Sequence, residues 1–283
     1  MGLRIQNNIE AFNTHRQLTA TSTQASKSME KLSSGYRINR AADDAAGLGI
    51  SEKMRGQIGG LAQAQRNAQD GISLVQTAEG ALSEVHSMLE RVRDLKVQFN
   101  NGTLDQNDKS AIAAEVFEIA KEIKTISTDT KFNGTAVFSN NFSFQVGANQ
   151  GETISIAATA LSGAATAGGI STVIALGGAA GADAVSTALD TGDLAVISDI
   201  DKAIENVSKV RGNLGAVQNR LEHRLTNLAT YQENLTASES RIRDVDMAAE
   251  MTKFTKLNIL QQAGTSMLAQ ANQAPQGVLS LLR

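Results

Sequence analysis

The side chains best suited to catalysis in this chain are three histidines, and they are scattered along it. His15, His86 and His223 fall on separate predicted helices. The strings HExxH, GxSxG and GxxxxGK[S/T], which would place a metal, a nucleophile or a phosphate, are missing from the sequence. The chain has no Cys, so disulfides, thiolate metal sites and a cysteine nucleophile are excluded. We therefore expect no enzyme, no catalytic residue, no cofactor and no metal site.

Two weaker motifs have structural explanations. Gly47-Leu48-Gly49 is a lone G-x-G without the preceding strand of a dinucleotide fold, which favours a helix start. The run DQNDK from Asp105 to Lys109 resembles a Ca²⁺ loop but lacks its Gly and its closing Glu. We expect this run to cap a helix.

A charged string, LERVRDLK from Leu89 to Lys96, is the remaining candidate for recognition chemistry. By its residues alone it reads as a solvated helix face carrying neighbouring charges. The residues alone do not assign a recognition role to Arg91, Leu95 or Glu115.

The composition narrows the class of partner. The 283 residues include 26 Lys+Arg and 29 Asp+Glu, a net charge of -3, so no basic surface is expected to bind nucleic acid. Residues 153–182 carry no charge, but they are mostly Ala, Gly, Ser and Thr and too weakly hydrophobic to enter a membrane. The first residues lack the apolar run of a cleaved signal peptide. Only 4% of residues are aromatic, which suits long packed helices better than a rounded enzyme.

Apolar residues that repeat every seven positions predict two long helices. One region combines two such series, and a second region carries an unbroken series, which together indicate helices that bury a narrow seam against a partner helix. The first region reads Leu61, Ala68, Val75, Leu82 and Leu89 beside Ala64, Gly71, Ala78, Val85, Val92 and Phe99, and the second reads Ile200, Val207, Leu214, Leu221, Leu228, Leu235 and Ile242.

The middle of the chain predicts different structure. A shorter helix follows the first long helix, and its apolar face holds Ile112, Val116, Ile119, Ile123 and Ile126. Next, Asn133-Gly134 marks a turn, and the alternating runs NFSFQVG and ETISIA predict a β-hairpin. Residues 157–192 are a low-complexity insert, either a small domain or an exposed flexible loop. The predicted fold class is mainly α, a long antiparallel helical bundle or coiled coil with a β-hairpin and a small variable insert.

Both ends of the chain predict amphipathic helices that need partners, because a single helix has too little surface to bury its own stripe. Two similar charged segments, from Ser34 to Leu48 and from Ser238 to Met251, separate these end helices from the long ones. If the chain folds back on itself, we expect the two segments to lie side by side and their opposite charges to pair. The charges concerned are Arg37, Arg40, Asp43 and Asp44 in the first segment and Arg241, Arg243, Asp244 and Asp246 in the second.

Four strings resemble bacterial flagellin. They are NIEAFNTHRQL from Asn8, KLSSGYRINRAADDAAGLGISEKMR from Lys31, NAQDGISLVQTAEGAL from Asn67 and ILQQAGTSMLAQANQAPQGVLSLLR from Ile259. The resemblance extends over roughly residues 1–150 and 194–283. It implies a structural subunit that polymerises into the flagellar filament for swimming motility.

The resemblance also implies a division of the chain. Expected are an N-terminal inner-tube helix at 1–34, a spoke at 35–45, shell helices and a β-hairpin at 46–156, a variable outer insert at 157–194, the C-terminal shell helix at 195–240, a spoke at 241–249 and a C-terminal inner-tube helix at 250–283. Contacts between subunits would then involve Ile5, Ile9, Phe12, Leu257, Leu260, Met267, Val278, Leu279 and Leu282.

The partners implied are further copies of the chain in a helical homopolymer, the flagellar type III export apparatus, a flagellin chaperone, the filament cap and the hook-associated junction proteins. The location would be the extracellular flagellum, with no nucleic-acid or membrane partner. Flagellins sensed by the Toll-like flagellin receptor of animals use an Arg and a Leu of the charged string and a Glu of the next helix, which match Arg91, Leu95 and Glu115.

Three positions depart from the family pattern and are expected to adjust subunit packing: Lys96, Phe99 and Leu257. The alternative reading within the same system is a hook-filament junction protein with flagellin-like termini. An exported helical effector or adhesin, whose function would lie in residues 157–192, is a rival of another class.

Overall fold

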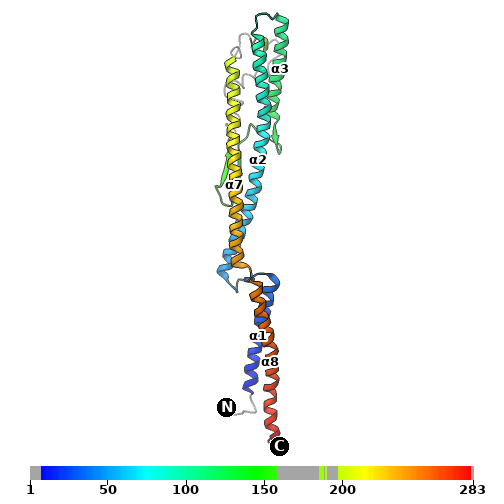
Figure 1. Cartoon of the computed structure of the whole chain (residues 1–283), viewed down its shortest axis with the longest axis vertical. Helices are drawn as coiled ribbons and strands as arrows, with labels where there is room; N and C mark the ends of the chain where they lie inside the picture. The colour runs from blue at the N-terminus through cyan, green and yellow to red at the C-terminus, as the bar shows by residue number, and fades with distance from the viewer. Residues whose placement is uncertain (1–7, 158–184, 188, 190–196, 282–283) are drawn as a thin grey trace. The chain divides into compact units, whose positions relative to one another are not determined.

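Five long helices and four short strands form the described part of the chain (Figure 1). The computed structural model describes residues 8–157, 185–187, 189 and 197–281, with side chains of the last helix as far as Gln273. The elements are α1 Ile9–Ser34, α2 Ala45–Phe99, α3 Gln106–Asp129, β1 Lys131–Phe132, β2 Thr135–Ala136, β3 Phe142–Gln145, β4 Thr153–Ile156, α7 Ile197–Arg243 and α8 Met247–Leu281. The mainly helical fold class is confirmed. Most of the predicted insert, 157–194, lies outside the described residues.

The helices begin where short polar side chains can accept hydrogen bonds from free backbone N–H groups. The carboxylate of Asp44 accepts from Gly47 N at 2.9 Å at the start of α2, so the G-x-G motif is a helix start, as expected. Asp105 and Asp108 form a reciprocal capping box on α3, which confirms the capping role of the DQNDK run. Asp246 accepts from Ala248 N and Ala249 N at 3.0 and 3.1 Å and starts α8.

The chain divides into two compact units, and residues 58–232 form the one with the larger core. Helices α2 and α7 run antiparallel there, since the Gln65 amide donates to Gln232 Oε1 and Arg93 pairs with Asp201 at 2.7 Å. Every member of the two sevenfold series of α2 is buried. The series of α7 is buried from Ile200 to Leu228. Leu235 and Ile242, which continue it, belong to the other unit and are half-buried.

Helix α3 and the end of the insert complete this core. On α3, the spacing correctly predicts the buried Ile112, Val116 and Ile123. Ile119 and Ile126, the other two members of the series, are partly buried against the same core. Val185 and Leu189, two described residues of the insert, are also buried in the same cluster. The Lys96 ammonium donates to Leu189 O. The described residues of the insert are therefore tied to this core by buried apolar side chains and by a charged hydrogen bond from Lys96 of α2.

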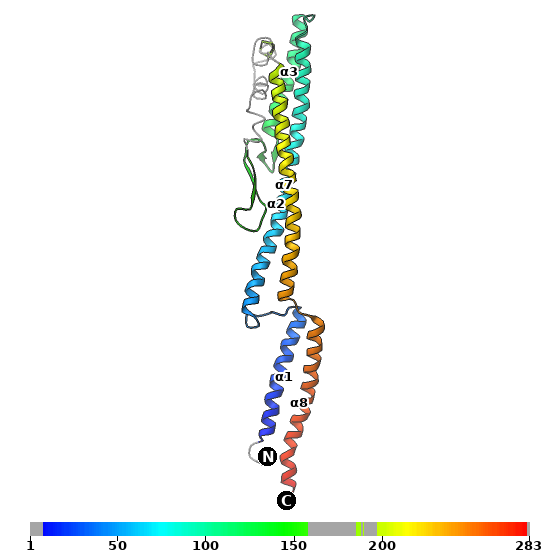
Figure 2. The same ribbon diagram turned by 60° about the vertical axis from the view of Figure 1, so that its left-hand side comes forward.

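The predicted hairpin region forms two antiparallel hairpins. The first, β1–β2, turns at Asn133-Gly134, where both residues have positive φ, 49° and 78°. The second, β3–β4, lies beside α2 and α7 (Figure 2). Asn67 Nδ2 on α2 donates to Gln145 O at 3.0 Å, and Arg224 Nε on α7 donates to Val146 O at 3.0 Å. These two side chains hold the hairpin across both helices.

The other unit comprises residues 1–57 and 233–283. Its main feature is the antiparallel pair α1–α8, which Figures 1 and 2 both show side by side. Asn8 Nδ2 donates to Ala271 O at 2.7 Å near one end of the pair. Ser28 Oγ donates to Glu250 Oε1 at 2.5 Å near the other. The first and last helices of the chain are thus bonded to each other at both ends.

Candidate assembly surface

The seam between α1 and α8 combines small and polar residues with five large apolar ones: Leu18, Leu32, Phe254, Leu257 and Leu268. On α8 the least exposed positions alternate spacings of four and three: Glu250, Phe254, Leu257, Gln261, Gly264, Leu268 and Ala271. The matching positions of α1 are Ala11, Thr14, Leu18, Thr21, Ala25, Ser28 and Leu32. Leu18 lies so close to Gly264 that a Cβ built there would be 3.2 Å from Leu18 Cδ1. The seam therefore permits close approach of the two helices at Gly264.

Other large apolar side chains of this helix pair face outward. Among the described residues, eleven large hydrophobic side chains are exposed, and nine of them belong to the unit of α1 and α8. Eight of the nine lie on α1 and α8 themselves, and we call them the outer apolar residues: Ile9, Phe12, Met29, Met247, Met251, Ile259, Leu260 and Met267. Exposure of this many large side chains on one helix pair marks an interaction surface.

The predicted subunit contacts are placed in three groups. Ile9, Phe12, Leu260 and Met267 are outer apolar residues, with exposures between 47% and 71%. Leu257 is 6% exposed and belongs to the seam, so it is enclosed within its own chain. The prediction also named Ile5, Val278, Leu279 and Leu282, whose side chains lie outside the described residues.

Sequence reasoning missed Met29, Met247, Met251 and Ile259 as outward-facing residues. On α1, Leu18 and Ala25 lie in the seam, whereas Met29 is 56% exposed. Ile259 and Leu260 lie at the edge of a shallow hollow of about 460 Å³ that Thr252, Thr255 and Lys256 also line. For the three missed residues of α8, Met247, Met251 and Ile259, the sequence does hold a signal. That helix has more large apolar residues than a single stripe can hold.

The two charged segments lie side by side, as predicted, and form a joint of backbone hydrogen bonds. Tyr36 and Asp244 make an antiparallel bridge. Arg37 N donates to Arg243 O at 2.7 Å, and Val245 N donates to Gly35 O at 3.0 Å. The joint therefore resembles a minimal two-stranded sheet between the end of α1 and the start of α8.

The expected pairing of opposite charges across the joint is wrong for the side chains that the structure describes. Arg37 Nη2 donates to the carbonyl of Ile242 at 2.5 Å. Arg243 stacks over the Tyr36 ring, 4.8 Å from its centroid, and pairs with Glu52 of α2 at 2.7 Å. Arg241 donates to Ser238 Oγ at 2.9 Å on its own helix. Asp43, Asp44 and Asp246 accept hydrogen bonds from backbone N–H groups at a turn and at two helix starts, and the arginines bind other groups.

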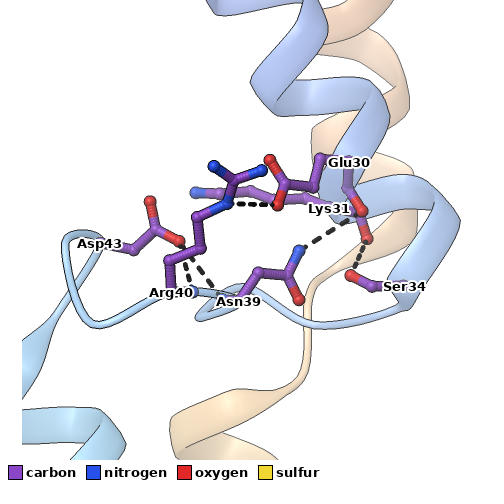
Figure 3. Close-up of polar contacts among 6 residues, drawn as sticks. All are labelled: Glu30, Lys31, Ser34, Asn39, Arg40 and Asp43. Atoms are coloured by element: carbon purple, nitrogen blue, oxygen red, sulfur yellow. Dashed lines mark hydrogen bonds and ion pairs between the residues drawn. The ribbon is translucent and has the colours of Figure 1, made fainter.

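The first charged segment folds back onto α1 through local contacts (Figure 3). Arg40 pairs with Glu30 at 2.9 Å. Asp43 Oδ2 accepts from Arg40 N at 3.0 Å and from Asn39 N at 3.3 Å. These backbone hydrogen bonds, Arg40 first, together with the charges of Lys31 and Lys27, lower the pKa of Asp43 below 3.8 despite an opposing effect of burial. The segment is thus held in one shape by an ionised carboxylate.

The residues matched to receptor recognition lie together on α2 and α3. Arg91 Nε and Nη2 donate to Glu115 Oε1 at 2.8 and 2.6 Å, and the two side chains are 55% and 44% exposed. Leu95 is 1% exposed and belongs to the core cluster that includes Ile112 and Val116. The accessible part of this site is therefore an ion pair, supported by a leucine underneath that a partner does not reach.

The three departures from the family pattern are all buried inside the chain. Lys96, Phe99 and Leu257 are 2%, 3% and 6% exposed. Lys96 and Lys109 place their ammonium groups 5.1 and 5.4 Å from the Phe99 ring centroid. The direct contacts of all three side chains are thus with their own chain. Because none of them is exposed, they do not reach a neighbouring subunit directly, contrary to the expectation that they adjust subunit packing.

The described residues hold no cluster of catalytic or metal-binding type. His15, His86 and His223 lie on α1, α2 and α7, and His86 pairs with Glu90 of its own helix at 3.4 Å. No group of three His, Asp or Glu side chains in this part of the chain is placed to hold a metal ion. Among the same residues, no helix has the length and apolar character needed to cross a membrane.

Comparison with known proteins gives one consistent family. Residues 5–143 match the bacterial flagellin N-terminal helical region, and residues 197–282 match the C-terminal helical region. Flagellin of Bacillus subtilis (strain 168) is 51% identical over 99% of this chain and 100% of its own length. The flagellar filament 33 kDa core protein of Treponema phagedenis is 45% identical over 99% of each chain. The crystal structure of Bacillus cereus flagellin, 27% identical, covers 58% of this chain and 88% of that one with a TM-score of 0.44.

The two family regions cover both ends of the chain and therefore include α1, α8 and the joint between them. The full-length relatives add that the whole length, including the middle, has counterparts in flagellins. The chain therefore belongs to the bacterial flagellin family, whose members are structural subunits of the flagellar filament.

Proposed function

We propose that this chain polymerises through the outer apolar residues of α1 and α8. The observation that carries the proposal is the exposure of eight large apolar side chains on this helix pair, Phe12 and Ile259 among them, while smaller residues such as Ser28 and Gly264 take positions in the seam. This arrangement does not stabilise a monomer, because the exposure of large apolar side chains to water is unfavourable in free energy. In a polymer the same side chains are buried between subunits. Burial stabilises the assembly by about 25 cal/mol per Å² of apolar surface, so a few hundred Å² per helix contributes several kcal/mol.

Two exposed positions test this proposal with little risk to the monomer fold. Phe12→Ser and Ile259→Ser change side chains that are 71% and 61% exposed, so each variant should stay helical by circular dichroism. Val97→Ser is the matched control, because Val97 is 51% exposed but lies on α2 in the other unit. Seeded growth of purified protein, followed by light scattering and negative-stain electron microscopy, should slow strongly for the first two variants only. Normal filament growth by both would overturn the proposal.

We also propose the division of the chain that the resemblance to flagellin implies. Residues 1–34 and 250–283 would form the inner tube, 35–45 and 241–249 the spokes, and 46–156 with 195–240 the shell, with 157–194 outermost. The observed helices support these bounds closely, although α7 continues to Arg243 and α8 begins at Met247. Deleting 255–283 should leave a soluble, folded shell that does not polymerise, and seeded filament growth by that truncated chain would refute the division.

Family membership supports the remaining proposals on export and partners. The chain would leave the cell through the flagellar type III apparatus with a flagellin chaperone, and would assemble in the extracellular flagellum between the hook-associated junction proteins and the filament cap. The alternative, a hook-filament junction protein, predicts few copies and no long homopolymer. Electron microscopy of the purified protein after heating and re-cooling separates the two, because only a filament subunit re-forms long filaments.

We propose in addition that the Arg91–Glu115 pair is a contact for the Toll-like flagellin receptor of animals. Both side chains are about half exposed, so a partner can reach them, and the buried Leu95 would act by supporting the surface. Arg93 offers a matched control, since it lies two residues away, is 45% exposed and pairs with Asp201 at 2.7 Å. In cells carrying the receptor and a reporter, Arg91→Ala should weaken signalling much more than Arg93→Ala. Unaltered signalling by Arg91→Ala would refute this contact.

A further inference from the structure

The methionines are the side chains of this chain most open to two-electron oxidation. The sequence contains no Cys and no Trp, so seven Met supply all of its sulfur. A peroxide transfers one oxygen atom to the thioether sulfur, R–S–CH₃ + H₂O₂ → R–S(=O)–CH₃ + H₂O, and the sulfur is oxidised while the peroxide is reduced. The product carries a strong hydrogen-bond acceptor where the thioether was apolar. Oxidation therefore matters most where a methionine must be buried against a partner.

Among the described residues, four methionines are exposed, and all four are outer apolar residues. Met29, Met247, Met251 and Met267 are 51% to 56% exposed. Met54 and Met88, by contrast, are only partly exposed, and Met88 packs against the core of the larger unit. The oxidisable sulfur of the described residues is thus concentrated on the helix pair proposed to polymerise.

Three of the four methionines lie at one end of that helix pair. The hydrogen bond from Ser28 to Glu250 joins the residues that directly precede Met29 and Met251. Met247 lies four residues before Met251, so these two share one face of α8. Flexible, polarisable thioethers suit a surface that must adapt to a partner, and their sulfoxides do not.

We propose that Met29, Met247, Met251 and Met267 form a reversible oxidation site that governs assembly of the free subunit. The inference rests on the proposed polymerisation through the outer apolar residues. In the free chain a peroxide reaches all four sulfurs, and the resulting sulfoxides oppose burial between subunits. Methionine sulfoxide reductases, with a thiol reductant, would return the oxygen as water and restore the thioethers. In a filament the same residues would be shielded by neighbouring subunits.

The first measurement maps oxidation and does not depend on polymerisation. The full-length monomer is treated with hydrogen peroxide, quenched with catalase and digested, and each methionine peptide is quantified by mass spectrometry. Met29, Met247, Met251 and Met267 should oxidise several times faster than Met54 and Met88, following their exposure. Equal rates at all six positions would overturn the site.

The second measurement compares seeded growth of oxidised and untreated protein, each variant against its own untreated sample. The growth rate of the natural sequence should fall about tenfold or more on oxidation, because burial of an unpaired polar oxygen is unfavourable, and reductase treatment should restore it. A chain with Met29, Met247, Met251 and Met267 all changed to Leu should lose this sensitivity. A chain with Met54→Leu and Met88→Leu should keep it.

The outcomes separate the two proposals. If the untreated natural chain does not grow on seeds, the polymerisation proposal fails, while the oxidation map still reports on the site. If it grows and oxidation at the four positions leaves its rate unchanged, the regulatory inference is wrong and polymerisation stands. Persistent sensitivity of the fourfold Leu variant would also overturn the inference, since the effect would then arise elsewhere.

Discussion

Ser28 and Glu250, 222 positions apart, share a hydrogen bond of 2.5 Å between Ser28 Oγ and Glu250 Oε1. Ser28 is 1% exposed and the Glu250 side chain 12%, so the contact is largely withdrawn from water. Burial raises the pKa of Glu250, and the Ser28 hydroxyl together with Lys253 and Lys31 more than offsets this, so that the pKa lies below 4.5. One serine hydroxyl thus helps to keep an ionised carboxylate inside the α1–α8 seam.

Ser28→Ala should destabilise the α1–α8 pair. The change removes a donor and leaves a half-buried carboxylate with fewer partners, which costs about 1 to 3 kcal/mol. Urea unfolding followed by circular dichroism of the full chain measures the loss, and Ser33→Ala, at an exposed position of the same helix, is the control. Equal stability of the two variants would mean that the hydroxyl contributes nothing to the pairing.

Acid should loosen the same unit. The pKa values of Asp43 and Glu250 are lowered in the folded chain, below 3.8 and 4.5 respectively. Their contribution to stability is therefore fully present above those values and is lost as the pH falls through the lower folded pKa values. The effect of Asp43 is small because it is exposed. Carboxyl carbon chemical shifts, titrated by NMR, should show Glu250 with a midpoint below 4.5, and that midpoint should rise in Ser28→Ala. A midpoint unchanged by the substitution would contradict the assigned role of the hydroxyl.

Two glycines in long helices should respond in opposite ways to alanine. Gly212 on α7 is exposed, and a Cβ built there meets nothing within 4 Å, so Gly212→Ala should stabilise the chain by about 0.5 to 1 kcal/mol. At Gly71 on α2 a Cβ would lie 3.2 Å from the Phe144 ring and 3.3 Å from Leu221. Gly71→Ala should therefore lose that gain or reverse it, because it pushes the β3–β4 hairpin from the helix. Thermal unfolding of both variants decides the point, and an equal gain would show that the hairpin yields freely.

The long helices and their core could be predicted from the sequence, because a sustained sevenfold series of apolar residues indicates a long helix that buries one seam against another helix. All eleven series members of α2 are buried. The next step of one series after Leu89 is Lys96, and it is buried too. Spacing alone could have placed Lys96 in the core, but its charge argued against burial. The carbonyl of Leu189 and the Phe99 ring beside the ammonium group favour its buried position.

The α1–α8 seam could not be predicted in the same way. Its positions on α8 follow a regular spacing, but Glu250, Gln261 and Gly264 occupy three of them. A stripe drawn through apolar residues therefore shifts by one position to Leu260 and Met267, which face solvent. Sequence patterns assume that large apolar residues pack inside their own chain, and that assumption fails for helices whose partner is another molecule. At the joint the two segments do lie side by side, but they are joined by backbone hydrogen bonds that charge counting does not predict.

Substitutions of Arg91 and of Leu95, two of the residues matched to receptor recognition, should lower the free energy of unfolding by very different amounts. Arg91 and Glu115 are about half exposed, so Arg91→Ala should cost about 0 to 1 kcal/mol. Leu95 is 1% exposed within the core cluster, and Leu95→Ala should cost about 2 to 5 kcal/mol because it opens a cavity between α2 and α3. Urea unfolding of the two variants measures both values, and a double-mutant cycle with Glu115→Ala isolates the pair. Loss of recognition in Leu95→Ala therefore cannot by itself identify a receptor contact, whereas loss in the folded Arg91→Ala variant can. A small cost for Leu95→Ala would instead place that side chain at the surface and return it to the set of direct contacts.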